Sequence, residues 1–356
     1  MGGAEDKPII PVRPELACDP PFWARGPHLQ TIAANYLPSP APDLPWERVR
    51  LDLEDGDALA LRVLEGTTGV AVLLFHGLGG SADGHYLRRA AARFHGLGHA
   101  VLAVNHRGAG EGAGWSRRSY NSGSTGDLEA VVRFARARFP GRLQVAVGFS
   151  ISANMLLLLL GRGGADLPDR AIAVNPPVDL EACSRRLVTG FNWCYDQYFV
   201  RRLRREVMLR PGALPLPPTR TLRALDAVYT APQAGYPGRD AYYAQCSSGP
   251  WLGAIAVPTV ILTALDDPFA PGGDILGCGL SPAVHLHAEP FGGHMGYLSR
   301  NLADRRWLDY ALEHYLGQLT QKPRPGAGAV AEAVPDYLAN RRETSPQLMF
   351  SRKALM

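Results

Sequence analysis

The pentapeptide Gly148-Phe149-Ser150-Ile151-Ser152 decides the fold that we expect for this chain. The apolar run before it, residues 143–147, is typical of a buried strand, and the apolar run after it, residues 153–160, is typical of a buried helix. A strand, a sharp turn with a serine at its tip and a helix form the geometry that lifts a hydroxyl out of a sheet as a nucleophile. A serine that only caps the following helix is the alternative, but the strand before Ser150 favours the nucleophile.

The composition is that of an ordinary globular protein. The chain has 356 residues, of which 46% are apolar and 20% are charged, and this length permits a large buried core. A net charge of +4 is only mildly basic, so we expect no nucleic-acid partner. The five cysteines are scattered without C-x-x-C spacing, which predicts neither a metal site nor a redox motif and fits a reducing compartment.

The sequence predicts a cytoplasmic protein. The first residues lack the basic and then apolar segments of a secretory signal, and the run 155–160 is too short to span a bilayer. One dense basic run, residues 201–210, predicts a solvated helix face. Contact of that run with anionic lipid headgroups is the alternative, so a peripheral contact with a membrane stays open.

Short apolar runs alternate with helical stretches along most of the chain, which predicts an α/β fold with a mostly parallel central sheet flanked by helices. Two antiparallel strands, 46–53 and 58–65, come first, around the turn Asp55-Gly56-Asp57. Further strands are expected at 70–75, 100–104, 145–148, 171–174, 257–265 and 284–288, and helices at 84–97, 126–138, 151–161 and 301–317.

Three segments depart from this alternation. Residues 178–250 carry an aromatic-rich stretch, the basic run and several prolines, and they predict an insertion that folds over the site as a helical cap. The Pro-rich residues 1–45 are expected to be irregular and to pack along the body. We therefore expect one domain over residues 1–320 and a Pro-, Gly- and Ala-rich C-terminal tail, residues 321–356, that is poorly ordered.

Two later stretches supply the partners that a serine nucleophile needs. His294 follows two glycines, between a predicted strand and the last predicted helix, and is the candidate general base. Asp266 and Asp267 end an apolar run, and one of them would orient the imidazole and stabilise its positive charge. Adjacent residues at a strand end point in different directions, so only one can face His294. We prefer Asp267, which opens the turn Asp267-Pro268-Phe269, and we assign Asp266 to bracing that turn.

The stretch His76-Gly77-Leu78-Gly79-Gly80 follows the first predicted parallel strand. Its glycines allow backbone amides to turn toward the site, and we expect the amides of Leu78 and Ile151 to form an oxyanion hole. One such donor is worth about 2.7–4 kcal/mol of transition-state stabilisation. His76 and Gly77 are given a supporting role in fixing this loop. The chain has no GxxxxGK[ST] pattern and no GxGxxG pattern, and we expect no cofactor.

These stretches resemble the YheT-like branch of the α/β-hydrolases over roughly residues 20–317, and the order Ser, Asp, His is that of the α/β-hydrolases. The branch usually has Gly-Phe-Ser-Leu-Gly-Gly-Asn at the serine, whereas this chain has Ser152 and Ala153 in place of two glycines. The position of Ser152 must be small, and serine makes a tighter fit there. The more specific marks of the resemblance are Pro27-His28-Leu29-Gln30-Thr31, Asp266-Asp267-Pro268-Phe269 and Gly292-Gly293-His294-Met295-Gly296.

The resemblance implies an α/β-hydrolase fold and hydrolysis of carboxylic esters, often short- to medium-chain acyl esters or lipids, without a cofactor. We therefore expect a serine carboxylesterase or lipase that uses Ser150, His294 and Asp267 through an acyl-enzyme. An alcohol O-acyltransferase that uses the same acyl-enzyme is one alternative, and a catalytically weak binding protein of this fold is another. The expected partner is a small-molecule ester or lipid, and the sequence does not indicate an oligomeric state.

Overall fold

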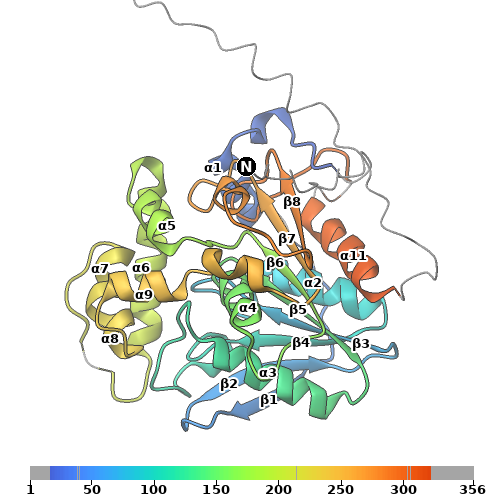
Figure 1. Ribbon diagram of the computed structural model, residues 1–356, viewed down its shortest axis with the longest axis horizontal. Helices are drawn as coiled ribbons and strands as arrows, with labels where there is room; N and C mark the ends of the chain where they lie inside the picture. Colours follow the sequence, from blue (N-terminus) through green and yellow to red (C-terminus); the bar gives the residue numbers. More distant parts are fainter. Residues whose placement is uncertain are drawn as a thin grey trace, which may run out of the picture.

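An eight-stranded sheet in the order β1-β2-β4-β3-β5-β6-β7-β8 runs through the centre of the molecule (Figure 1). The structure is a computed structural model, and it describes residues 17–321 except 38, 40, 214, 303 and 305. The pairs β1–β2 and β2–β4 are antiparallel, and the other neighbouring pairs are parallel. The strands are β1 (Glu47–Asp52), β2 (Ala58–Leu64), β3 (Val70–Phe75), β4 (Ala100–Asn105), β5 (Leu143–Phe149), β6 (Arg170–Val174), β7 (Thr259–Ala264) and β8 (Val284–Glu289).

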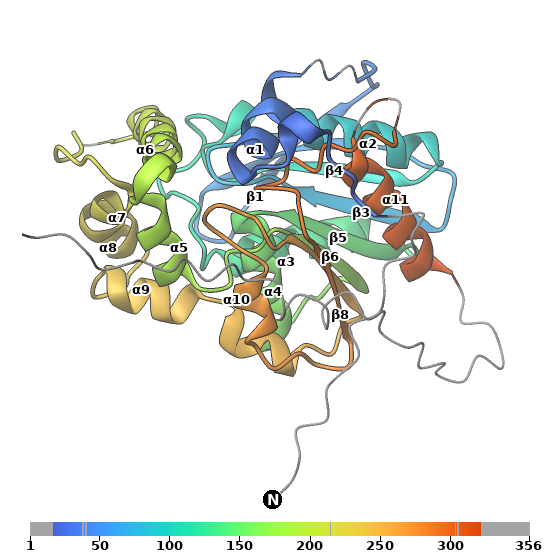
Figure 2. The same cartoon turned by 90° about the horizontal axis from the view of Figure 1, so that it is seen from above.

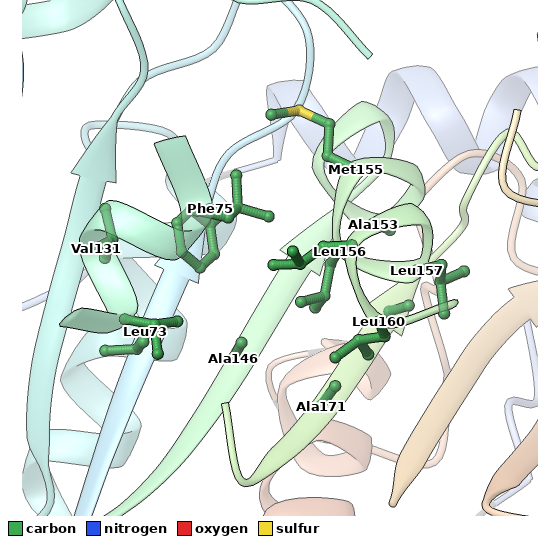
Figure 3. Close-up of a cluster of buried hydrophobic side chains, with 14 of the residues drawn as sticks. Leu73, Phe75, Val131, Ala146, Ala153, Met155, Leu156, Leu157, Leu160 and Ala171 are labelled. Carbon is green, nitrogen blue, oxygen red and sulfur yellow. The ribbon is translucent and has the colours of Figure 1, made fainter. Parts of the chain in front are cut away.

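Helices cover both faces of this sheet, which explains why its inner strands are apolar at successive positions. Along β3, Leu73 and Phe75 pack on one face with α3 (Thr125–Arg138) and α4 (Ile151–Arg162), as Figure 3 shows. Val72 and Leu74, which alternate with them, pack on the other face, where α2 (His85–Gly96) and α11 (Trp307–Thr320) lie (Figure 2). The predicted mostly parallel α/β sheet is confirmed.

The segment between β6 and β7 forms a group of helices that lies to one side of the sheet in both views (Figures 1 and 2). No helix in the described ranges has the length and apolar character needed to cross a membrane. The helices of this group are α5 (Leu180–Leu187), α6 (Trp193–Met208), α7 (Leu222–Leu225), the π-helix η5 (Asp226–Thr230), α8 (Ala231–Gln233) and α9 (Arg239–Cys246). The remaining short helices are η2 (Phe22–Ala24), η3 (Gly110–Gly112), η4 (Gly190–Asn192), η6 (Gly249–Ala254) and α10 (Gly273–Leu276).

Two expectations about the ends of the domain were wrong. The N-terminal segment contains a helix, α1 (Pro27–Tyr36), where irregular chain was expected; proline fits its first turn because that position needs no N–H donor. The last helix begins at Trp307 rather than near 301, because Leu298 and Arg306 pair as an isolated β-bridge just before it. Apart from Gln321, the predicted tail 321–356 lies outside the described residues.

The turn from β5 into α4 leaves no room for a side chain at Gly148. A Cβ at this residue would lie 2.6 Å from the carbonyl oxygen of Ser152 and 2.9 Å from the Cα of Ala153. Ser150, at the tip of the turn, adopts φ 55° and ψ −118°, a conformation that is strained for a residue with a side chain. Residues 151–161 of α4 are all buried, and this packing holds the strained turn in place.

We expect Gly148→Ala to lower the free energy of unfolding by about 1–3 kcal/mol, because its Cβ would meet backbone atoms that have no alternative rotamer. Gly126→Ala in α3 is the matched control, since nothing lies within 4 Å of its Cβ, and it should be neutral or stabilising by about 0.5–1 kcal/mol. Urea denaturation measures both variants. Equal stability of the two would contradict the close approach at Gly148.

Candidate active site

Ser150 lies where β5 ends and α4 begins, and only 9% of its surface is exposed. Its hydroxyl makes no capping hydrogen bond to α4. A Cβ on Gly77 would lie 3.2 Å from the Cβ of Ser150, so glycine lets the loop after β3 come close to the hydroxyl. The serine is therefore enclosed between two chain segments and presented toward a third.

That third segment carries His294. Its Nε2 lies 2.8 Å from the Oγ of Ser150, and its Nδ1 lies 2.7 Å from Oδ2 of Asp267. A carboxylate can only accept, so Nδ1 carries the hydrogen and Nε2 is left to accept from the serine hydroxyl. The structure thus brings Ser150, His294 and Asp267 into one hydrogen-bonded chain, although they are 27 to 144 residues apart in sequence.

The carboxylate of Asp267 is buried and surrounded by donors. The backbone amides of Phe269 and Ala270 donate to Oδ1 at 3.1 and 2.9 Å, and the side-chain amide of Asn175 donates to Oδ2 at 2.8 Å. Burial by itself would raise the pKa of Asp267, but the neighbouring His294 and the hydrogen bonds to this carboxylate outweigh it and hold the pKa below its ordinary value. Asp267 is therefore an anion that can stabilise a positive charge on the imidazole.

Asp266 faces a different partner. Its Oδ1 accepts hydrogen bonds from the backbone amides of Gly292 and Gly293, both at 2.8 Å. Burial raises the pKa of this carboxyl above its ordinary value, against the two amide hydrogen bonds, which lower it. Asp266 thus braces the loop that carries His294, while its neighbour Asp267 contacts the imidazole itself.

The loop after β3 holds its amides in alternating directions. The amides of Gly77 and Gly79 donate to the hydroxyls of Tyr86 and Tyr120, at 2.8 and 2.7 Å. The amide of Leu78, between them, and the amide of Ile151 at the start of α4 have no hydrogen-bond partner within the described part of the chain. Two free donors next to Ser150 are the arrangement that stabilises an oxyanion.

Ser152 joins this loop to the turn at Ser150. Its hydroxyl lies 2.5 Å from the carbonyl oxygen of His76, to which it donates, and 2.7 Å from Nε2 of His106. Nδ1 of His76 lies 2.7 Å from the carbonyl oxygen of Gly77, and Nε2 of the same ring accepts a hydrogen bond from the amide of His106 at 3.2 Å. Burial lowers the pKa of His76 to about 4, so that both its ring nitrogens keep these neutral roles. Ser152, which stands where the YheT-like branch usually has glycine, therefore belongs to a buried hydrogen-bond network.

Several supporting residues were missed by the sequence reasoning. Asn175 follows β6 with φ 47°, and its side chain also contacts the carbonyl oxygen of Gly293 while accepting from the hydroxyl of Tyr297 at 2.8 Å. Thr31 of α1 accepts a hydrogen bond from the amide of His294 at 2.8 Å. An asparagine directly after a buried apolar strand was the available signal for Asn175, since asparagine tolerates positive φ.

An apolar pocket opens beside Ser150. Its walls include Leu78 and Ile151 from the loops at the ends of β3 and β5, and Phe269, whose ring centroid lies 4.2 Å from that of His294. The rest of the lining comes mainly from the helices between β6 and β7, including Leu180, Leu187, Phe199, Leu203, Val207, Leu222 and Leu225. Within the described ranges, no group of three or more metal-ligating side chains is placed to hold an ion.

The basic run 201–210 is not one solvated face, so that expectation was wrong in part. Arg201, Arg202 and Arg205 are exposed, but Nε of Arg202 also donates to the carbonyl oxygen of Gly79 at 2.8 Å. Arg210 is buried, with its guanidinium against the backbone of Arg107. The run therefore also ties α6 to the loop after β3, which a count of charges does not reveal.

Known proteins share this arrangement of sheet and helices. A family model described as the alpha/beta hydrolase fold matches residues 70–300. The Escherichia coli (strain K12) protein named "Putative esterase YheT" is 33% identical over 306 residues, covering 81% of this chain and 89% of YheT. Phospholipase ABHD3 of Mus musculus is 27% identical, over 81% of this chain and 69% of that protein.

Among solved structures, the Pyrococcus furiosus esterase Pf2001 in space group P212121 aligns with a TM-score of 0.56 over 80% of this chain and 97% of that one. Its sequence identity of 15% makes this a likeness of fold alone. The family model spans more than half of the chain, and YheT is matched over most of both sequences. The chain belongs to the α/β-hydrolase fold family, in the branch that contains YheT.

Proposed function

We propose that the protein is a serine hydrolase that cleaves carboxylic esters through an acyl-enzyme. The observation that carries this proposal is the hydrogen-bonded chain from Ser150 through His294 to Asp267, with two unpartnered amides beside the serine. A serine hydroxyl is a weak nucleophile until an adjacent base accepts its proton, and Nε2 of His294 is within hydrogen-bond reach of it. The names of the relatives, an esterase and a phospholipase, support the same class of reaction.

In the first half of the reaction, Oγ of Ser150 attacks the ester carbonyl carbon while its proton passes to Nε2 of His294. The carboxylate of Asp267 stabilises the imidazolium, and the amides of Leu78 and Ile151 bind the oxyanion. When the tetrahedral intermediate collapses, the leaving alcohol takes the proton from Nε2. The acyl group remains on Ser150.

In the second half, a water molecule takes the place of the alcohol. It attacks the acyl carbon and gives a proton to Nε2 of His294, and the same two amides bind the new oxyanion. Collapse of this second intermediate breaks the bond to Ser150, whose oxygen recovers the proton from Nε2. The carboxylic acid leaves, and the site returns to its starting state.

The substrate that this site fits best is an ester with an apolar acyl chain. The pocket beside Ser150 is lined mostly by aliphatic and aromatic side chains, and burying a hydrocarbon chain there yields about 25 cal/mol per Å² of apolar surface. We assign helices α5 to α9 the role of a cap, because they supply most of this lining. Short- to medium-chain acyl esters and lipids both meet this description.

Hydrolysis of p-nitrophenyl esters with two to sixteen carbons in the acyl chain tests the proposal. We expect wild-type protein to show an optimum chain length, and Ser150→Ala to lose that activity at every length while it stays folded by circular dichroism. A fluorophosphonate probe should label wild-type protein and leave Ser150→Ala unlabelled. Folded wild-type protein that is neither active nor labelled would favour a binding protein with this fold.

The two adjacent aspartates make a matched pair. We expect Asp267→Asn to lower kcat by about 10³–10⁴-fold, because an amide neither stabilises the imidazolium nor fixes the tautomer of His294. Asp266→Asn should lower kcat far less, because an amide oxygen can still accept hydrogen bonds from the amides of Gly292 and Gly293. Steady-state kinetics on one ester decide between them, and a larger loss in Asp266→Asn would overturn the assignment.

The hydroxyl of Ser152 is expected to matter for rate. Ser152→Ala leaves the carbonyl oxygen of His76 and Nε2 of His106 without that partner, and we expect kcat to fall about tenfold with little change in KM. Ser281→Ala is the matched control, since it also removes a buried hydroxyl that donates to a backbone carbonyl, that of Ile255, away from the site. Equal kcat in the two variants would restrict Ser152 to a packing role.

A further inference from the structure

The pocket beside Ser150 changes character along one helical segment of the cap. One part of its wall is apolar: Leu222 of α7 packs in one cluster with Leu78 and Phe269, which flank the proposed catalytic residues. The π-helix η5 follows α7 directly and contributes polar side chains to the same pocket. The pocket that opens at Ser150 therefore also presents hydrogen-bonding groups from η5.

The polar groups of η5 share one face. Asp226, Tyr229 and Thr230 all line the pocket, whereas Val228 on the same turn is 46% exposed. A π-helical turn is rare and is often found at functional sites, because its extra residue changes which side chains face inward. Here it follows the apolar Leu225 and places a carboxyl group on the pocket wall.

Asp226 has hydrogen-bonding capacity that the protein does not fill. The hydroxyl of Tyr243 donates to its Oδ2 at 2.7 Å, and the side chain of Thr230 is a second polar neighbour. An ionised carboxylate offers about four acceptor positions, so acceptor sites remain. Burial and the charge of Asp196 raise the pKa of Asp226 to about 6, against the side chains of Tyr243 and Thr230 and the charge of Arg239, which lower it. Above pH 7 the group is therefore mostly a carboxylate, which can only accept.

The kind of substrate group that best fits beside Asp226 follows from the free energy of desolvating that group in the pocket. A plain alkyl chain would exclude water from the free acceptor positions without replacing it, which costs about 1–3 kcal/mol. An ammonium group would lose several kcal/mol of hydration on the way into an apolar pocket. A neutral hydroxyl costs much less to desolvate, and it supplies the donor that the carboxylate lacks.

We propose that this pocket takes an acyl chain that carries a hydroxyl group, and that Asp226 accepts a hydrogen bond from that hydroxyl. The inference rests on the proposed function, because it assigns the pocket to the acyl part of the ester that Ser150 cleaves. We assign the pocket to the acyl part because this part stays bonded to Ser150 in the acyl-enzyme, and Ser150, Leu78 and Ile151 all line the pocket.

Paired substrates test this assignment. Each p-nitrophenyl ester of an unsubstituted acid with four to twelve carbons is compared with the ester of its terminally hydroxylated counterpart at pH 7.5. At the best length we expect kcat/KM to favour the hydroxylated ester by at least about tenfold, the size of one hydrogen bond to a charged group. A ratio near one at every length in active protein would overturn the inference and leave the proposed ester hydrolysis standing.

Variants locate the effect at Asp226. Asp226→Leu should reverse the ratio in favour of the unsubstituted esters, and Asp226→Asn, which keeps the shape of the side chain, should reduce it if the leucine variant does not fold. Asp240→Asn on the exposed surface of α9 is the control and should keep the wild-type ratio. Wild-type ratios in both folded Asp226 variants would contradict a contact with the hydroxyl.

The pH dependence separates recognition from a structural role. The wild-type ratio should fall as the pH drops through about 6, because protonated Asp226 is a weaker acceptor, and Asp226→Asn should show no such change in ratio. A ratio that stays constant between pH 5 and pH 8 would contradict the inference.

A binding measurement does not depend on turnover. Ethyl esters of the same paired acids are titrated into Ser150→Ala protein by calorimetry, and the hydroxylated ester should bind at least about tenfold more tightly. Tighter binding without hydrolysis by wild-type protein would contradict the proposed reaction and keep the pocket assignment. Equal binding of the pair would overturn the assignment.

Discussion

The strained turn between β5 and α4 is the constraint on which the rest of the site depends. Ser150 adopts positive φ only because α4 packs so closely on the strand that its backbone lies against Gly148. Such strain costs about 1–3 kcal/mol and persists only where the surrounding structure determines it. The long apolar face of α4 is buried in the core and holds the helix against the strand, and this packing fixes the position of the Ser150 hydroxyl.

The loop after β3 depends on the same junction. Ser152, two residues after Ser150, donates a hydrogen bond to the carbonyl oxygen of His76. This bond ties the start of α4, which carries the amide of Ile151, to the loop that carries the amide of Leu78. Burial lowers the pKa values of His76 and His106, and this keeps both rings neutral in the network. Ser152 therefore fits a position that usually holds glycine because it is small and because its hydroxyl has hydrogen-bond partners in His76 and His106.

The sequence predicted what local pattern determines. β3 spans the predicted residues 70–75, and the β1–β2 hairpin and the helices α2, α3 and α4 lie where periodicity placed them, within one or two residues. Contacts that only the sheet order creates were not predictable: Asn175 meets Asp267 across 92 residues, and α1 reaches His294 through Thr31. Those contacts require that β6 and β7 be neighbours and that the N-terminal segment cross the strand ends.

Reaction and recognition come from different parts of the chain. The proposed nucleophile, base and acid stand at the ends of the sheet strands, and they make no hydrogen bond to helices α5 to α9 in the described residues. The pocket that would hold the acyl chain is built mainly from those helices. Asp226 is the carboxyl group that these helices place in the pocket wall, where the hydroxyl of Tyr243 donates a hydrogen bond to it. The residues that the sequence pattern identifies most readily therefore specify the reaction, whereas the substrate is decided by a segment whose sequence resembles no motif.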